Sequence, residues 1–162
     1  MSPKLATAYN TLGRIYRMKG DDELAREMYE TAMEYAPRFD VPHLNLAQLL
    51  LGAGREGEAL AEFRTAARLN PFNYVALANL GVKAYKDREL QPAAALFDRA
   101  IRIREDYAIA HKYLGLIHAE REQPVASVRH LERSLELDGQ QPEAEKMRFL
   151  LEEMKKRASA QG

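Results

Sequence analysis

The 162-residue chain repeats itself every 34 residues, and this period limits the folds that are open to it. A glycine or an alanine recurs at this spacing, each time directly after a leucine. The column consists of Gly13, Ala47, Gly81 and Gly115. A fixed period of this length is typical of repeat architectures, in which each unit packs on its neighbours. We therefore expect four repeats, which cover residues 6–39, 40–73, 74–107 and 108–141.

Each repeat contains two apolar segments whose spacing is helical. Apolar side chains recur at intervals of three and four residues, which places them on one face of a helix. The breaks between the paired segments fall at Gly20, Gly54, Arg88 and Glu122. Glycine is suited to a left-handed helix end, and the other two residues are not. We therefore expect the turns at Arg88 and Glu122 to be different or slightly strained.

The glycine column needs a reason, because glycine inside a helix costs about 1 kcal/mol relative to alanine. The second segment of each repeat carries a small residue and a large residue in step with it. The large residues are Tyr29, Phe63, Phe97 and Leu131. We expect the glycines to face the second helix of their own repeat, so that close packing offsets the local cost.

These columns resemble those of the tetratricopeptide repeat (TPR) family. In the first repeat the match rests on Leu12, Gly13, Tyr16, Ala25, Tyr29, Ala32 and Pro37. The fourth repeat keeps Leu114 and Gly115 but has Ser127 and Ser134 where small alanines are usual. The resemblance implies an all-α, right-handed solenoid of four helix-turn-helix repeats. It also implies protein–protein binding, as a scaffold or an adaptor.

Residues 142–157 predict one further helix, and residues 158–162 a disordered tail. The apolar stripe of this helix is formed by Ala144, Met147, Leu150, Leu151 and Met154. Charged residues fill the remaining faces, as a terminal unit requires for solubility. We interpret the helix as a cap on the fourth repeat. Phe149 lies off the stripe, as a partly exposed aromatic or a contact for a neighbouring chain.

In TPR-like arrays the first helix of each repeat lines a concave groove. The corresponding residues here are basic and polar in the first repeat and unusually apolar in the next three, and a large exposed apolar patch marks a binding site. The predicted groove consists of Asn10, Arg14, Arg17, Leu44, Asn45, Gln48, Leu51, Val75, Asn79, Val82, Tyr85, Lys86, Ile109, Lys112, Tyr113 and Leu116. We expect it to bind a peptide or an amphipathic helix of a protein partner.

Two ligand-binding patterns of the family are only partly present. In some members, asparagines in the column of Asn45 and Asn79 hold the backbone of a peptide. Other members hold acidic C-termini with a clamp of lysine, asparagine and arginine. That clamp is incomplete here, because Val75 or Ile109 stands where a lysine is needed.

Composition and motifs give no support to other classes of function. The formal net charge is zero, so nucleic acid is not an expected partner. The chain has no cysteine, which excludes disulfides and thiolate metal sites. The sequence GAGREG at residues 52–57 has dinucleotide-binding spacing, but it follows a predicted helix instead of a strand. We therefore expect no cofactor.

The histidines and hydroxyls show no catalytic arrangement of recognised spacing. His111 and His118 lie seven residues apart, about 10.5 Å along a helix, which is too far to share a metal. We expect both to be partly buried and hydrogen-bonded, and we expect the chain not to be an enzyme.

No stretch resembles a signal peptide or a membrane span, so we expect a cytoplasmic protein without membrane insertion. Two alternatives to the adaptor remain open. One is a homo-oligomeric assembly scaffold in which one copy receives another. The other is a substrate-recruiting TPR module of a larger enzyme. A solution mass would test the first, and the full-length gene the second.

Overall fold

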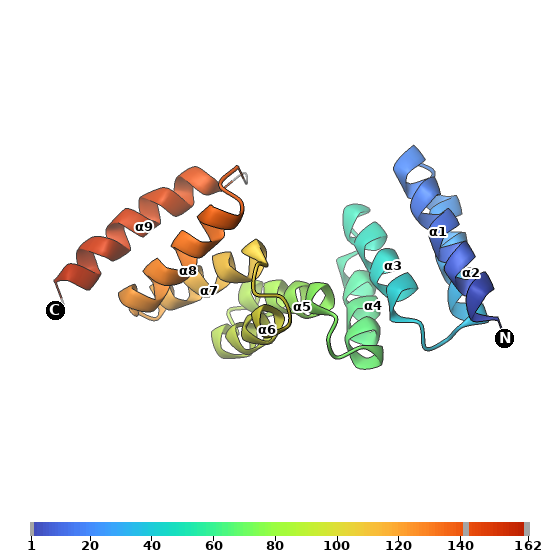
Figure 1. Cartoon of the computed structure of the whole chain (residues 1–162), viewed down its shortest axis with the longest axis horizontal. Helices are drawn as coiled ribbons and strands as arrows, with labels where there is room; N and C mark the ends of the chain where they lie inside the picture. The colour runs from blue at the N-terminus through green and yellow to red at the C-terminus, as the bar shows by residue number, and fades with distance from the viewer. Residues whose placement is uncertain (1, 141–142, 161–162) are drawn as a thin grey trace. The chain divides into compact units, whose positions relative to one another are not determined.

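A computed structural model of the chain describes residues 2–140 and 143–160. Over these residues it contains nine helices and no strand (Figure 1). The helices are α1 (Pro3–Lys19), α2 (Asp22–Tyr35), α3 (Asp40–Gly52), α4 (Glu56–Leu69), α5 (Tyr74–Lys86), α6 (Leu90–Ile103), α7 (Ala108–Glu120), α8 (Pro124–Leu137) and α9 (Ala144–Ser159). The all-α architecture expected from the helical spacing is confirmed.

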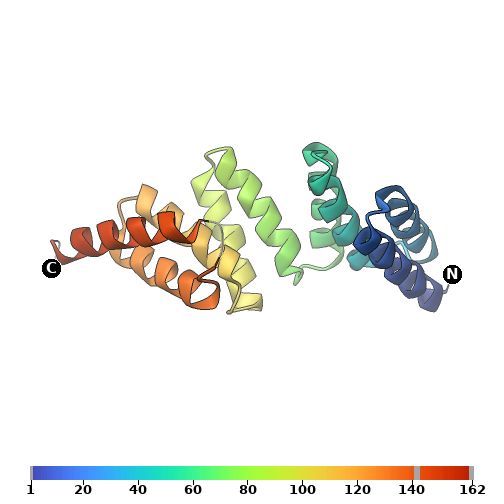
Figure 2. The same cartoon turned by 90° about the horizontal axis from the view of Figure 1, so that it is seen from above.

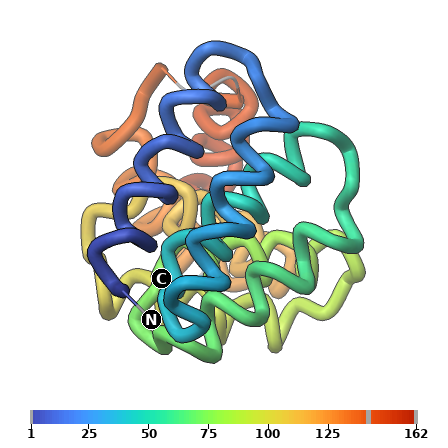
Figure 3. Tube along the Cα trace, turned by 90° about the vertical axis from the view of Figure 1, so that its right-hand side faces the viewer, coloured from blue at the N-terminus to red at the C-terminus, as the bar shows by residue number. Residues whose placement is uncertain are grey.

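The chain divides into two compact units, Met1–Ala76 and Leu77–Gly162. In the first unit α1 packs on α2, α2 on α3, and α3 on α4. Figure 3 shows the traces of α1 and α2 side by side. In the second unit α6 packs on α7, α7 on α8, and α8 on α9, and Figure 2 shows α9 alongside α8. Sequential helices are thus neighbours in space within each unit, as in a solenoid.

The glycine column faces the second helix of its own repeat, as predicted. A Cβ atom added to Gly13 would lie 2.6 Å from Cε1 of Tyr29. The corresponding distance at Gly81 is 2.9 Å to Cζ of Phe97. These distances are too short for carbon atoms, so there is no room for a side chain at Gly13 and Gly81 without movement of Tyr29 and Phe97. In the second repeat the small residue Ala47 occupies the equivalent position.

The four turns within the repeats share one conformation. The φ angle is 84° at Gly20, 74° at Gly54, 66° at Arg88 and 55° at Glu122. In each turn the residue after the turn residue donates its backbone N–H to the carbonyl four residues before the turn residue, over 2.9–3.0 Å. The turns are therefore alike, and the strain that we expected falls on Arg88 and Glu122, which carry side chains in the left-handed region.

Helix α9 covers the outer side of α8. Its buried side chains are Ala144, Met147, Leu151 and Met154. Met147 and Leu151 form an apolar cluster with Leu131 of α8. This packing accounts for the capping role that the stripe predicted.

The limits of α9 differ from the predicted ones. The helix continues to Ser159, two residues past the predicted end, and the N–H of Ala160 still donates to the carbonyl of Lys156 over 3.2 Å. The first residues of the predicted tail at 158–162 are therefore helical, because no glycine or proline interrupts Ala158–Ala160. Residues 141–142 and 161–162 lie outside the described part of the chain.

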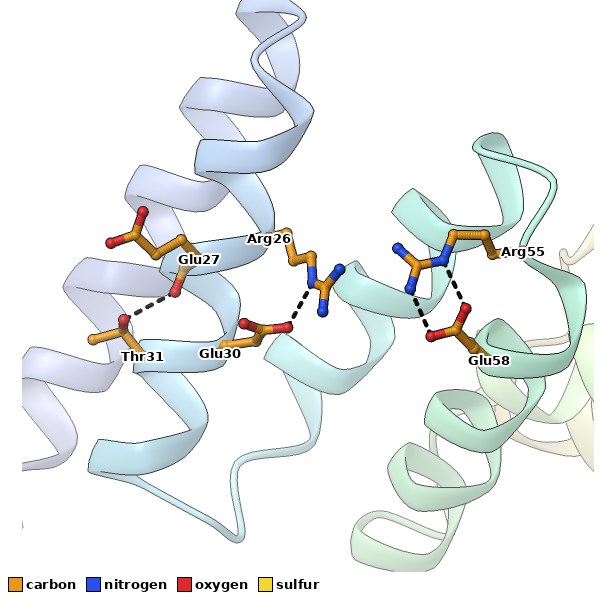
Figure 4. Close-up of polar contacts among 6 residues, drawn as sticks. All are labelled: Arg26, Glu27, Glu30, Thr31, Arg55 and Glu58. Carbon is orange, nitrogen blue, oxygen red and sulfur yellow. Dashed lines mark hydrogen bonds and ion pairs between the residues drawn. The ribbon is translucent and has the colours of Figure 1, made fainter.

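Short-range ion pairs occupy the outer surface of the second helices in the first unit (Figure 4). Arg26 pairs with Glu30 over 2.7 Å, and Arg55 pairs with Glu58 over 2.6 Å. Such exposed pairs contribute little to stability, typically about 0.5 kcal/mol or less. They do, however, neutralise the arginines that they involve.

Candidate functional site

The predicted groove residues line two cavities, one in each unit. The first, which we call the basic cavity, has a volume of about 320 Å³ and is lined by Arg14, Arg17, Met18, Tyr29, Asn45 and Gln48. The second, which we call the aromatic cavity, also has a volume of about 320 Å³. It is lined by Tyr85, Lys112, Tyr113, Leu116, Glu143, Lys146, Met147 and Leu150. Eight of the predicted groove residues thus fall in these two places.

Tyr113 is the centre of the aromatic cavity. Its ring stacks on Phe97 with centroids 5.1 Å apart and planes 4° apart. The ring of Tyr85 meets it edge-on, at 5.3 Å and 70°. Stacked and edge-to-face pairs of this kind are favoured by the charge distribution of aromatic rings. The two tyrosines are therefore held in place before any ligand arrives.

The hydroxyl of Tyr85 is also fixed. It donates a hydrogen bond to the carboxylate of Glu120, which forms an ion pair of 2.8 Å with Arg88. Burial and the hydrogen bond to Glu120 raise the pKa of Tyr85. The phenol therefore stays neutral, and Tyr85 lines the cavity as an uncharged side chain.

Charged groups line the rim of the aromatic cavity. Nζ of Lys112 lies 3.2 Å from Glu143 and 5.2 Å from the centroid of the Tyr113 ring. The hydrogen bond from Lys112 lowers the pKa of Glu143. Lys146 is exposed on α9. A mostly apolar hollow with a charged rim is suited to an apolar side chain of a protein ligand.

The contribution of α9 to this cavity was missed by the sequence analysis, which assigned its whole apolar stripe to packing. The buried residues of the stripe follow a spacing of three, four and three from Ala144 to Met154. Leu150 falls outside that spacing and is half-buried, and it lines the cavity. The sequence signal that could have revealed this contribution is an apolar residue, Leu150, in addition to the four that the packing on α8 requires.

Asn10 is a correction to the predicted groove. It is only 6% exposed, and its Oδ1 atom accepts a hydrogen bond of 2.8 Å from Nδ2 of Asn45. Asn10 therefore joins α1 to α3 and offers little surface to a ligand. The reason is that α1 packs on α3 as well as on α2, a contact that the repeat pattern does not reveal.

The other predicted groove residues lie outside the two cavities. They are Leu44, Leu51, Val75, Asn79, Val82, Lys86 and Ile109. Leu51 and Ile109 are each 42% exposed. Their role in binding stays a prediction.

Three histidines gather on the other side of the α7–α8 pair. Nδ1 of His130 lies 3.0 Å from Nδ1 of His111, and the ring of His118 stacks on His130 at 5.5 Å. His111 is buried and its Nε2 donates to the carbonyl of Glu105 over 2.9 Å. The predicted burial and hydrogen bonding of His111 are thus confirmed. His130, which the sequence did not single out, is also buried and contacts both of the other histidines.

No group of three or more histidine, aspartate or glutamate side chains in residues 2–140 and 143–160 has an arrangement that holds a metal ion. The two buried rings instead hydrogen-bond to each other. Because Nε2 of His111 donates to a carbonyl, its Nδ1 accepts in the neutral ring, and Nδ1 of His130 is the donor.

The stability of the chain will fall as the pH is lowered from 7 to 5. Burial, with His111, Arg129 and His118 nearby, lowers the pKa of His130 from 6.5 to about 4. The unfolded state therefore binds more protons than the folded state between these values. The contribution of neutral His130 to the free energy of unfolding is therefore complete above pH 6.5, and it is lost as the pH falls towards 4. We expect a loss of about 2 kcal/mol at pH 5.

Urea unfolding of the intact chain at the two pH values measures this loss. The variant His130→Gln is the comparison, because it keeps a polar side chain but does not titrate. Its stability should change less with pH. An equal pH dependence in both proteins would show that other groups are responsible.

The comparison with known proteins now identifies the family. Tetratricopeptide repeat family models match residues 6–39, 44–108 and 84–142. The chain belongs to the tetratricopeptide repeat family. Proteins of this TPR family are generally non-enzymatic scaffolds, and their fold is a protein–protein interaction module.

One curated relative is anaphase-promoting complex subunit 3 of Schizosaccharomyces pombe (strain 972 / ATCC 24843), with 31% identity over 114 residues. The match covers 64% of this TPR chain and 17% of that subunit. The chain therefore corresponds to a small part of this relative.

Solved TPR structures share the fold. Pseudomonas aeruginosa pilF superposes with a TM-score of 0.75 at 24% identity, over 94% of this chain and 70% of that one. The first TPR of Spaghetti (RPAP3), bound to the HSP90 peptide SRMEEVD, gives a TM-score of 0.66 at 19% identity. That match covers 75% of this chain and 97% of the other. At these identities the likeness concerns the fold alone.

The part of the TPR chain that the structure describes has no helix that is both long and apolar enough to cross a lipid bilayer.

Proposed function

We propose that the chain is a scaffold or adaptor that binds an apolar side chain of a partner's helix or extended segment in the aromatic cavity. One observation carries the proposal. Tyr85 and Tyr113 form the wall of a hollow of about 320 Å³ that Leu116 and Leu150 complete with apolar surface. A volume of this size accommodates one or two side chains and is small for a drug-sized ligand.

The rigidity of the cavity favours binding. Tyr113 is stacked on Phe97, and Tyr85 is tied to Glu120. Since these rings are already ordered, a ligand would not have to immobilise them, and this removes part of the entropic cost of association. Tyrosine is also enriched among the residues that dominate binding energy in interfaces.

The proposal includes no catalytic step. TPR proteins are generally scaffolds, and the buried histidines of this chain already have packing and hydrogen-bonding roles. The peptide-bound Spaghetti structure supports peptide binding as the kind of interaction. Amphipathic helices and extended peptides are both common ligands of apolar grooves.

Substitution of Tyr85 by alanine will weaken partner binding by about 2 kcal/mol, or roughly 30-fold. The reason is the loss of one aromatic wall of the cavity. Because the ring also packs on Tyr113, we expect some loss of melting temperature as well. The measurement is calorimetry with a peptide selected from a random display library against the intact chain, at a temperature where both proteins are folded.

Phe149→Ala is the matched control. This aromatic residue lies on α9, is 76% exposed and does not line the cavity. Its loss should leave peptide affinity unchanged. If Phe149→Ala weakens binding and Tyr85→Ala does not, the peptide binds the outer face of the cap and the aromatic cavity is not the site.

Self-association is a second candidate, because exposed apolar side chains also occur away from the cavities. Leu5, Leu12 and Ile15 of α1 are 44%, 41% and 42% exposed. Apolar surface of this kind can bind a second copy of the chain. Sedimentation over a range of protein concentrations tests this candidate, since a mass that stays monomeric at all of them excludes it.

A further inference from the structure

The basic cavity is lined by a buried hydroxyl group whose hydrogen has no acceptor among the described residues. Tyr29 is fully buried and lines the cavity. The guanidinium of Arg17 lies near its Oη atom and can only donate, so the hydroxyl hydrogen has no acceptor among the residues that the structure describes. An unsatisfied buried hydroxyl is destabilising. Packing does not require it, because the buried residues at the same repeat position are Phe63 and Phe97. We therefore expect the hydroxyl of Tyr29 to hydrogen-bond to a group from outside the chain.

Two guanidinium groups line the same cavity without a carboxylate partner. Nη1 of Arg17 donates to the neutral side chain of Gln48 over 3.1 Å. Arg14 forms no ion pair with any described residue, and it is exposed. Burial raises the pKa of Tyr29, and the charges of Arg17 and Arg14, together with a side-chain hydrogen bond from Arg17, oppose that rise. Since burial prevails, the phenol stays protonated and is available as a donor.

Two other arginines of the first unit differ in this respect. Arg26 and Arg55 are already paired with Glu30 and Glu58 on the surface of the second helices (Figure 4). Arg14 and Arg17, in contrast, line the cavity without a carboxylate partner among the described residues. Arginine forms strong, directional hydrogen bonds with carboxylate and phosphate groups.

We propose that the basic cavity binds an oxyanion carried by a side chain of the partner, either a carboxylate or a phosphate. Arg14 and Arg17 supply the positive charge, and the hydroxyl of Tyr29 donates a hydrogen bond to the anion. The partner segment is thus acidic where it meets the first unit. This inference rests on the proposed function, because it names the chemistry of the partner that the scaffold binds.

Nuclear magnetic resonance titration of the intact chain tests the proposal without any peptide. The probes are sodium acetate and inorganic phosphate, with sodium chloride at equal ionic strength as the reference. We expect saturable shifts of the Nε–H signals of Arg14 and Arg17. The anion with the higher affinity identifies the source, a carboxylate or a phosphorylated side chain.

Two variants assign the contacts. Tyr29→Phe and Arg17→Gln should each weaken anion binding about tenfold, since each removes a hydrogen bond to a charged group. Tyr29→Phe should keep or raise the melting temperature, because it deletes an unsatisfied hydroxyl and keeps the ring against Gly13. Arg55→Gln is the control, and it should leave the affinity unchanged.

Any of three results would overturn the inference. The first is the absence of a saturable shift with both anions. The second is an equal loss of anion affinity in Arg55→Gln and Arg17→Gln, and the third is a Tyr29→Phe variant that has a lower melting temperature and binds anions normally. The outcome is independent of the aromatic cavity, since Tyr85→Ala should not alter anion affinity. Anion binding together with a Tyr85→Ala variant that binds peptide normally would reject the proposed aromatic site alone.

Discussion

A chain truncated after Gly139 will melt at a much lower temperature than the intact protein and will aggregate. The truncation removes α9, which covers the α8 residue Leu131 and the partly buried Val128 and Leu135. Burial of apolar surface contributes about 25 cal/mol per Å², so exposing roughly 200 Å² costs about 5 kcal/mol. Thermal unfolding and size-exclusion chromatography measure the two effects.

A full-length variant distinguishes the loss of cap packing from the effect of shortening the chain. Leu151→Asp places a charge in the buried cluster of α9 and α8, so it should reproduce most of the loss. Phe149→Ala, on the exposed face of the same helix, should have little effect. A truncated chain that stays monomeric with an unchanged melting temperature would mean that α9 is not a cap.

Substitution of Gly115 by valine will destabilise the protein by about 3 kcal/mol. A Cβ at this position would lie 2.7 Å from Cδ2 and 2.8 Å from Cγ of Leu131, and 3.2 Å from its backbone nitrogen. Rotation of the leucine cannot relieve all of these contacts, so α7 and α8 must separate. Local helix propensity would instead favour the change, because glycine is the poorer helix former. The sign of the change in stability therefore shows whether packing or helix propensity dominates at this position.

Gly57→Val is the matched control for this substitution. Gly57 lies in α4, and a Cβ atom there would meet nothing within 4 Å. Chemical denaturation should place its stability within about 0.5 kcal/mol of the parent protein. If Gly115→Val is equally harmless, the glycine column has no packing role.

The repeat pattern by itself predicted the fold, because the information lies in the spacing along the chain. The period of 34 placed the turns, and the glycine column indicated which faces meet, as the contact of Gly81 with Phe97 demonstrates. The positions of the turns and of the contacting faces depend on helix geometry and on a contact residue that lies a fixed number of residues away in the chain. The same reasoning holds for each repeat, so four copies gave four consistent signals.

The candidate sites were predicted only in part, because they depend on contacts that the period does not specify. Whether Asn10 faces a ligand or Asn45 is decided by how α1 lies against α3. Leu150 reaches the aromatic cavity because of the way α9 packs beside α8, and α9 is not part of the predicted repeats, so the repeat pattern does not indicate its position.

The unsatisfied hydroxyl of Tyr29 shows the difference most clearly. In the sequence this tyrosine is one more large residue in a column that also holds Phe63. Only the tertiary structure places its hydroxyl in a buried position beside Arg17, with no acceptor for its hydrogen among the described residues. Spacing along a helix decides which face a side chain occupies, but the satisfaction of a polar atom depends on every neighbour around it.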